Sequence, residues 1–227
     1  MLNIQNLQVS YKTNQVLKGL SANWSPNRIH GIVGLNGSGK TTLLNTIFGT
    51  VKAQQGTISF NGQPIKKSDI AFLETRNYFY SRITGKEYLG LFKANNPNFN
   101  FHEWNDVFGL PLSNLIDTYS TGMKKKLAFL GILSLNRPVL ILDEPFNGVD
   151  LESNENLKSI LRLMVKKQKT ILITSHIIDT LTTLCDDIHY LKNGIIESSF
   201  KQKDFQTLTE ELSKFGSDDV ESLVDSL

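Results

Sequence analysis

The segment with the clearest chemistry runs from Gly34 to Thr41 and reads GLNGSGKT. Its glycines let the backbone curl so that several N–H groups point at one spot, and a helix expected to start near Lys40 directs its N-terminal dipole there as well. Lys40 supplies a charge for the β- and γ-phosphates of a nucleotide, and the Thr41 hydroxyl can bind Mg²⁺. A chance glycine turn is the alternative, but an expected strand before the segment and a helix after it predict a phosphate-binding loop. The residues predicted to bind nucleotide here are Asn36, Gly37, Ser38, Gly39, Lys40, Thr41 and Thr42.

A pair of carboxylates at the end of an apolar run is the second chemical feature. The sequence VLILDEP, from Val139 to Pro145, predicts a buried strand that ends in Asp143 and Glu144. Asp143 is suited to holding Mg²⁺, and Glu144 is placed to polarise an attacking water. Acidic residues often end strands, so the pair alone is ambiguous. Together with the phosphate-binding loop it indicates a nucleoside triphosphatase.

Further motifs resemble those of the ATP-binding-cassette (ABC) ATPases. The sequence YSTGMKKKL, from Tyr119 to Leu127, resembles the family signature, whose common form is L-S-G-G-Q followed by basic residues. The order and spacing of the motifs match over most of the chain. By this resemblance Asp150 corresponds to the D-loop residue, His176 to the switch histidine, and Tyr11 to the aromatic that stacks on adenine.

The resemblance implies a mechanism that needs two cassettes. In this family two such domains pair head to tail, and the signature of one covers the ATP at the phosphate loop of the other. Ser120 and Gly122 are the residues expected to contact that ATP, and an anion site at a helix start agrees with this. A chain with one phosphate loop and one signature therefore needs a second copy or a sister chain, and the intact motifs favour a homodimer.

The signature departs from the common form at two positions. Thr121 stands where a second glycine is usual, so helix-compatible backbone is expected there. Met123 stands where glutamine is usual, and the form S-x-G-M-K resembles a sub-group that serves exporters. The family also places a glutamine or glutamate near Mg²⁺ at the start of its helical insertion. Glu74 is the expected counterpart here, with Thr75 as the alternative register.

The elements expected to position these residues form an α/β fold, a P-loop NTPase core of the ABC type with an antiparallel β subdomain and an inserted helical subdomain. The domain is expected to span residues 1–200, with the helical insertion at about 75–136. We expect helices at Glu152 to Lys167 and His176 to Cys185. Residues 201–227 form a short acidic tail that has room for one helix.

Composition limits the remaining classes. The chain has 227 residues, 40% of them hydrophobic, and a net charge of +2, which argues against a nucleic-acid partner. The run Lys124 to Lys126 is expected to be a solvated helix face. The single cysteine, Cys185, is expected to be buried and inert, and His30 and His189 lack the cysteine neighbours of a zinc site. No signal peptide is recognised, and Leu127 to Leu135 is too short to span a bilayer.

These observations predict an ATPase with ATP and Mg²⁺ as ligands that drives a transporter. The membrane part is expected to be separate permease subunits, so the chain is expected in the cytoplasm, on the cytoplasmic face of the membrane. The segment from Tyr78 to Tyr88 resembles the family surface that receives the permease. A soluble ABC ATPase with non-membrane partners is the alternative. A GTPase is disfavoured because no N-K-x-D motif for guanine is present.

Overall fold

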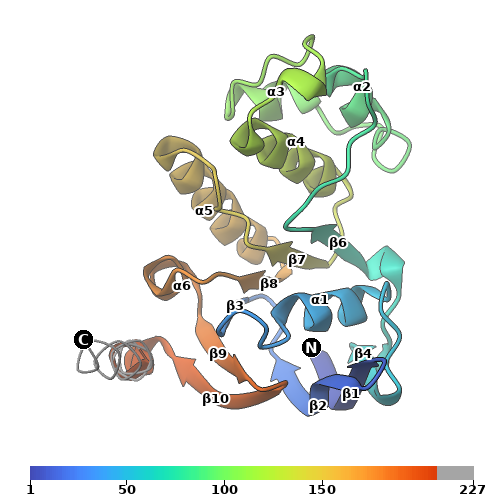
Figure 1. The fold of residues 1–227 in the computed structure, drawn as a ribbon. Coiled ribbons are helices and arrows are strands. Elements are labelled where there is room, and N and C mark those ends of the chain that lie inside the picture. The colour runs from blue at the N-terminus through green and yellow to red at the C-terminus, as the bar shows by residue number, and fades with distance from the viewer. Residues whose placement is uncertain (209–227) are drawn as a thin grey trace, which may run out of the picture.

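The computed structural model describes residues 1–208, which form two sheets with helices around the larger one (Figure 1). The smaller sheet is antiparallel, in the order β2-β1-β4-β5. Its strands are β1 (Leu2–Tyr11), β2 (Asn14–Trp24), β4 (Gln55–Phe60) and β5 (Gln63–Pro64). The pairing of β1 with β2 and β4 shows the register shifts of an irregular, twisted sheet. This sheet confirms the predicted antiparallel β part.

The larger sheet carries the chemistry, and its order is β10-β9-β3-β8-β7-β6. Its strands are β3 (Ile29–Val33), β6 (Ile70–Leu73), β7 (Val139–Asp143), β8 (Thr170–Thr174), β9 (Asp187–Lys192) and β10 (Ile195–Lys201). All neighbouring pairs are parallel except β9 with β10. Every residue of β3, β7 and β8 is buried, as expected for central strands covered on both faces.

The alternation along β7 shows how the two faces of this sheet are used. Val139 and Ile141 point to the core shared with the antiparallel sheet and with α1 (Lys40–Phe48). Leu140 and Leu142 point to the opposite core, which includes residues of the other helices. Those helices are α2 (Gly85–Gly90), α3 (Phe101–Asp106), α4 (Thr121–Ser134), α5 (Leu151–Lys166) and α6 (Ile178–Leu184).

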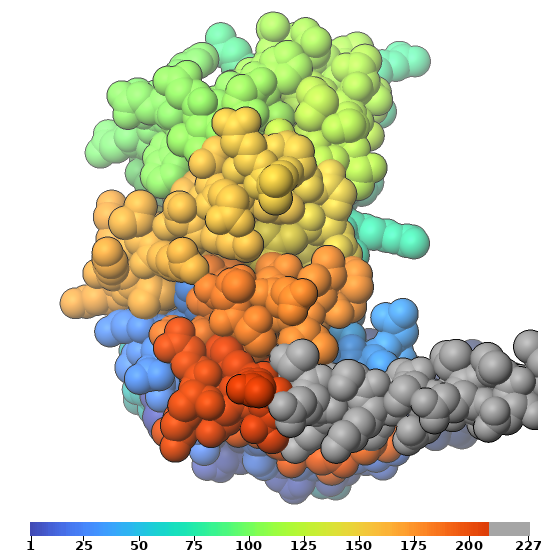
Figure 2. Space-filling model, turned by 90° about the vertical axis from the view of Figure 1, so that its left-hand side faces the viewer, coloured from blue at the N-terminus to red at the C-terminus, as the bar shows by residue number. Residues whose placement is uncertain are grey.

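The helical part between β6 and β7 extends beyond the larger sheet, against which α4 packs. Figure 2 shows residues of this part at one end of the molecule, with β9 and β10 toward the opposite end. Short 3-10 turns complete the path at Lys67–Asp69, Ile116–Thr118 and Gln202–Asp204. The helices expected at Glu152 and His176 are present, the second beginning two residues later than expected, at Ile178. Within residues 1–208, no helix is both long enough and apolar enough to cross a bilayer.

The chain beyond β10 remains attached to the larger core. Phe205 and Leu208 are buried there. The rest of the predicted acidic tail, with its expected helix, lies outside the described residues. Cys185 is buried, as expected, and burial raises the pKa of its thiol.

A polar cluster joins the N-terminal ends of β3 and β9. The Asp187 Oδ1 atom lies 2.6 Å from His30 Nδ1 and 2.8 Å from His189 Nε2. Burial alone would raise the pKa of Asp187, but hydrogen bonds from His189 and His30 outweigh it and hold that pKa well below its usual range. Ligands of a tetrahedral zinc ion lie about 3.3 Å apart when the bonds are about 2.0 Å. The contacts here are those of a hydrogen-bonded cluster, next to the buried ring of Trp24.

Candidate functional site

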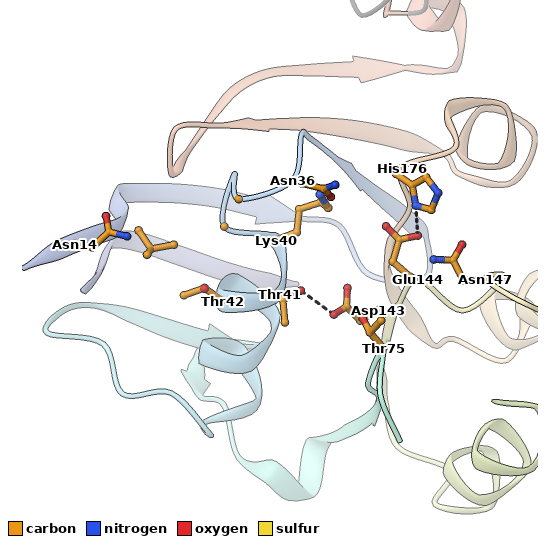
Figure 3. Close-up of a pocket in the computed structure, with 13 residues that line it drawn as sticks. Asn14, Asn36, Lys40, Thr41, Thr42, Thr75, Asp143, Glu144, Asn147 and His176 are labelled. Atoms are coloured by element: carbon orange, nitrogen blue, oxygen red, sulfur yellow. Dashed lines mark hydrogen bonds and ion pairs between the residues drawn. The ribbon is translucent and has the colours of Figure 1, made fainter. Parts of the chain in front are cut away.

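A cavity of about 650 Å³ lies where α1 begins and where β7 and β8 end. Parallel strands bring their carboxyl ends to one edge of a sheet, so residues distant in sequence meet there. Figure 3 shows polar side chains from these elements pointing into the same space. The cavity is lined by Asn14, Val16, Asn36, Gly37, Gly39, Lys40, Thr41, Thr42, Thr75, Asp143, Glu144, Asn147 and His176.

The loop before α1 has the geometry of a phosphate cradle. Gly39 is the N-cap of α1 with a φ of 109°, a conformation that favours glycine. A Cβ on Gly34 would lie 2.2 Å from the carbonyl oxygen of Leu191, so no side chain fits there. The Lys40 ammonium donates to the carbonyl oxygen of Gly34 at 2.6 Å. Burial lowers the pKa of Lys40, while the charges of Glu144 and Asp143 act to raise it.

Ser38 differs from the other predicted residues of this loop. It is buried and does not line the cavity. Among the described residues its hydroxyl has no hydrogen-bond partner.

Asp143 is held in place by two hydroxyl groups. Thr41 Oγ1 donates to its Oδ2 at 3.0 Å, and Thr174 Oγ1 donates to its Oδ1 at 2.6 Å. The same Thr174 oxygen accepts the backbone N–H of Glu144 at 3.0 Å. A hydroxyl and a carboxylate oxygen at the rim of a phosphate cradle are ligands that fit Mg²⁺, which prefers oxygen and keeps positions for water and phosphate.

Glu144 and His176 point toward each other in the wall of the cavity (Figure 3). Glu144 Oε2 lies 3.0 Å from His176 Nδ1. The carboxylate side chain is 13% exposed, whereas the histidine side chain is 55% exposed. Glu144 has a φ of 50°, a left-handed conformation that costs a residue with a Cβ some free energy and that occurs often at functional sites.

Two other predicted residues, Glu74 and Tyr11, lie outside the cavity wall. Thr75, the alternative to Glu74, lines the cavity, whereas Glu74 lines a second cavity. Tyr11 is 48% exposed at the end of β1, and Asn14 and Val16 line the cavity instead.

The two residues predicted to contact ATP from the signature are placed at the start of α4. Ser120 is the N-cap of this helix, and its Oγ accepts the backbone N–H of Met123 at 3.2 Å. Thr121 begins the helix, as its Cβ predicts. Gly122 packs so closely that an added Cβ would lie 2.3 Å from the carbonyl oxygen of Gly148. Neither Ser120 nor Gly122 lines the cavity that holds Lys40.

Asp150 also lies outside the cavity and caps α5. Its Oδ1 accepts the backbone N–H of Ser153 at 2.8 Å, and its Oδ2 accepts the Ser153 hydroxyl at 2.8 Å. The Lys126 ammonium donates to Oδ2 at 3.0 Å. These hydrogen bonds, those from Ser153 first, hold the pKa of Asp150 well below its usual range.

Comparison with known proteins decides the family. The family model described as ABC transporter matches residues 17–147, more than half of the chain. The chain belongs to the ABC transporter family. It is an ATP-binding protein of that family and an ATPase, as the motifs predicted.

Relatives and solved structures agree with this assignment. The ABC transporter ATP-binding protein YtrB of Bacillus subtilis (strain 168) is 30% identical over 226 residues, covering 94% of this chain and 75% of YtrB. The cobalt import ATP-binding protein CbiO of Salmonella typhimurium (strain LT2) is 28% identical over 216 residues, covering 86% of this chain and 79% of CbiO. A dimeric cassette, MJ0796 in a post-hydrolysis state with ADP and Pi, has a TM-score of 0.79 at 21% identity, covering 89% of this chain and 99% of that one. This likeness confirms the predicted fold class.

The prediction that Lys124 to Lys126 form a solvated helix face was wrong for two of the three lysines. Lys125 is 4% exposed and Lys126 is 9% exposed. The ammonium of Lys125 donates to the carbonyl oxygen of Glu144 at 2.6 Å, and that of Lys126 donates to Asp150 and to Ser153. The prediction failed because α4 is buried nearly all round from Lys125 to Ser134. The apolar run that follows the lysines was the available signal.

Proposed function

We propose that this chain is the motor subunit of a transporter and that it works as a head-to-tail dimer with separate membrane subunits. The observation that carries the proposal is that Ser120 and Gly122 lie outside the cavity lined by Lys40 and Glu144. A second cassette would bring its own signature over that cavity. Intact motifs on one chain favour a homodimer. The dimeric state of the similar cassette MJ0796 supports this arrangement.

In this proposal each group of cavity residues has a separate role in hydrolysis. The loop amides of residues 36–42 and the Lys40 ammonium bind the phosphates of ATP. Thr41 and Asp143 would hold Mg²⁺, which supplies charge neutralisation to the β- and γ-phosphates when bound. Glu144 accepts a proton from the water whose oxygen attacks the γ-phosphorus. His176 orients Glu144 and this water, and ADP leaves as the bond to the γ-phosphorus breaks.

The remaining predicted residues complete the proposed site around this centre. Tyr11 is exposed at the end of β1, so its ring is available to adenine on the side lined by Asn14 and Val16. Asp150 lies between α4 and α5, and we propose that it acts as the D-loop residue, in the loop that a partner cassette would contact. We assign Thr75, rather than Glu74, to the position nearest the phosphates, because Thr75 lines the cavity.

The membrane subunit docks, in this proposal, on the helical part. Tyr78 is 76% exposed and Tyr80 is 57% exposed, and their rings contact each other edge to face. Tyr78 also lines a second cavity of about 400 Å³, whose walls combine aromatic residues such as Phe72 and Phe92 with charged residues such as Arg137. A hollow with exposed aromatic residues at its edge and both apolar and charged residues in its wall suits a short amphipathic helix of a partner. Phe79, which lies between these two tyrosines in sequence, packs on the core instead.

Several wider features belong to the same proposal. The domain spans residues 1–200 with the helical insertion at about 75–136, and the start of the tail packs on its core through Phe205 and Leu208. No function is assigned to the tail at 201–227. The chain sits on the cytoplasmic face of the membrane through the permease and does not bind nucleic acid, because its net charge is only +2. We propose export as the direction from the S-x-G-M-K form, although the relative CbiO is named for import. A soluble ATPase with non-membrane partners is the second candidate.

The variant Glu144→Gln tests this proposal. It keeps the shape of the side chain but removes the base, so hydrolysis is expected to fall by about 10²–10⁴-fold while ATP binding persists. The control Glu103→Gln makes the same change on an exposed residue of α3. Light scattering should then show a dimer with ATP, and affinity purification from detergent-solubilised membranes should recover a multi-helix membrane protein. Parental hydrolysis would refute the catalytic assignment, and recovery with soluble partners alone would favour the second candidate.

A further inference from the structure

Lys125 is a buried charge that the reaction described above leaves without a role. Lysine is rarely buried this deeply unless its ammonium is paired, because removing the charge from water is costly. Here the ammonium lies 2.6 Å from the carbonyl oxygen of Glu144. The hydrogen bond is therefore charge-assisted and stronger than one between neutral groups. It acts on the main chain of the residue proposed as the catalytic base.

The main chain of Glu144 needs such support because its conformation is strained. With a φ of 50°, it persists only if surrounding groups hold it. Thr174 Oγ1 accepts its N–H at 3.0 Å, and Lys125 donates to its carbonyl at 2.6 Å. The N–H of Asn147 reaches the same carbonyl at 3.3 Å. Of these three hydrogen bonds, the one from the Lys125 ammonium is the shortest, and it is the only one with a charged donor.

The helix that carries Lys125 also carries the signature residues. Ser120 caps α4 five residues earlier, which is roughly 7 Å along the helix axis. The segment that follows β7 is bound to α4 at three places: Lys125 to Glu144, Gly122 against the carbonyl oxygen of Gly148, and Lys126 to Asp150. A shift of α4 would therefore be transmitted to the carboxylate of Glu144.

We propose that Lys125 is a positioning residue for ATP hydrolysis, which fixes the main chain of Glu144 from the signature helix. It aims the carboxylate at His176 and the cavity, and it makes that aim depend on the position of α4. In the dimer this links ATP of the partner, at the start of α4, to the base of the same chain. The inference rests on the catalytic role of Glu144 in the proposed function.

The test compares Lys125→Met, which removes the donor and the charge, with Lys125→Gln, which keeps a shorter donor. Single-turnover hydrolysis by the purified chain and equilibrium binding of a fluorescent ATP analogue are measured for each. A misplaced base predicts that the Met variant loses about 10- to 100-fold in rate. Its affinity for ATP stays within about twofold of the parent, and the Gln variant loses less rate. Lys166→Met, on an exposed residue of α5, is the matched control and keeps the parental rate.

A double variant separates positioning from general damage to the fold. If Lys125 acts through Glu144, adding Lys125→Met to Glu144→Gln changes the remaining rate by less than about twofold. A full multiplicative loss would overturn the proposal, as would parental hydrolysis by the Met variant or an equal loss of ATP affinity. If the Met variant does not fold, the same comparisons are made with Lys125→Gln. Should Glu144→Gln itself hydrolyse ATP normally, the proposed function fails first, so the two failures are distinguishable.

Discussion

The contact between α4 and the segment after β7 leads to a prediction about Gly122. An alanine there would place its Cβ 2.3 Å from the carbonyl oxygen of Gly148, whereas ordinary contacts begin at 3.4 Å. The opposing atom belongs to the main chain and cannot rotate away, so α4 or the loop must move by about 1 Å. Overpacking of this kind costs about 1–3 kcal/mol, and the better helix propensity of alanine returns at most about 1 kcal/mol.

The expected net loss in the free energy of unfolding for Gly122→Ala is therefore about 1–2 kcal/mol. In a chain of this length that corresponds to a fall in Tm of roughly 2–8 °C, measured by circular dichroism. Gly90→Ala is the matched control, because Gly90 is an exposed residue of α2 and an added Cβ meets no atom within 4 Å. A Gly122→Ala protein as stable as the parent would refute the tight contact, provided that Gly90→Ala leaves Tm unchanged or higher.

Two further predictions concern polar groups next to the sheet. Thr174→Val keeps the side-chain shape but removes the hydroxyl that serves Asp143 and the N–H of Glu144, so urea unfolding should show a loss of about 1–3 kcal/mol and hydrolysis should slow. Asp187→Asn should cost about 3 kcal/mol at neutral pH, because it removes the charge between His30 and His189. The folded pKa of Asp187 is depressed, so its stabilisation is present above the unfolded pKa of about 3.9 and is lost as the pH falls through the folded pKa. Urea unfolding of the parent and of Asp187→Asn at pH 7 and at pH 3.5 should therefore show a smaller difference in the free energy of unfolding at the lower pH. A constant difference would contradict the stabilising role of the Asp187 carboxylate.

The fold could be predicted from sequence wherever one local pattern dominates. The apolar runs at Val139 and Thr170 became central strands because buried parallel strands need apolar residues on both faces. The glycines before Lys40 became a loop and a helix start for equally local reasons. The 3.0 Å approach of Glu144 to His176, in contrast, depends on the pairing of β7 with β8, which no local pattern predicts.

Features that depend on how distant segments pack together could not be predicted from the sequence. A shift of one residue after β6 decides whether Glu74 or Thr75 faces the cavity, and neither side chain carries a signal for that choice. The prediction that the lysines of α4 are solvated failed for a different reason. A run of charges usually marks solvent, but consecutive helical residues point about 100° apart, so all three could not share one exposed face. Their partners, in the loop after β7, lie 19 and 24 residues away in sequence.

The packing around α4 also explains why its signature can depart from the common form. Met123, in place of the usual glutamine, packs its partly buried side chain against the larger core, where an amide would need new hydrogen-bond partners. Thr121 is exposed at the first position of the helix, where a β-branched residue costs little. Ser120 caps the helix by accepting the backbone N–H of Met123, so the cap does not depend on the side chain at position 123. Gly122 makes its close contact because it lacks a side chain. Neither departure therefore alters the Ser120 hydroxyl or the Gly122 main chain, the two groups proposed to contact a phosphate.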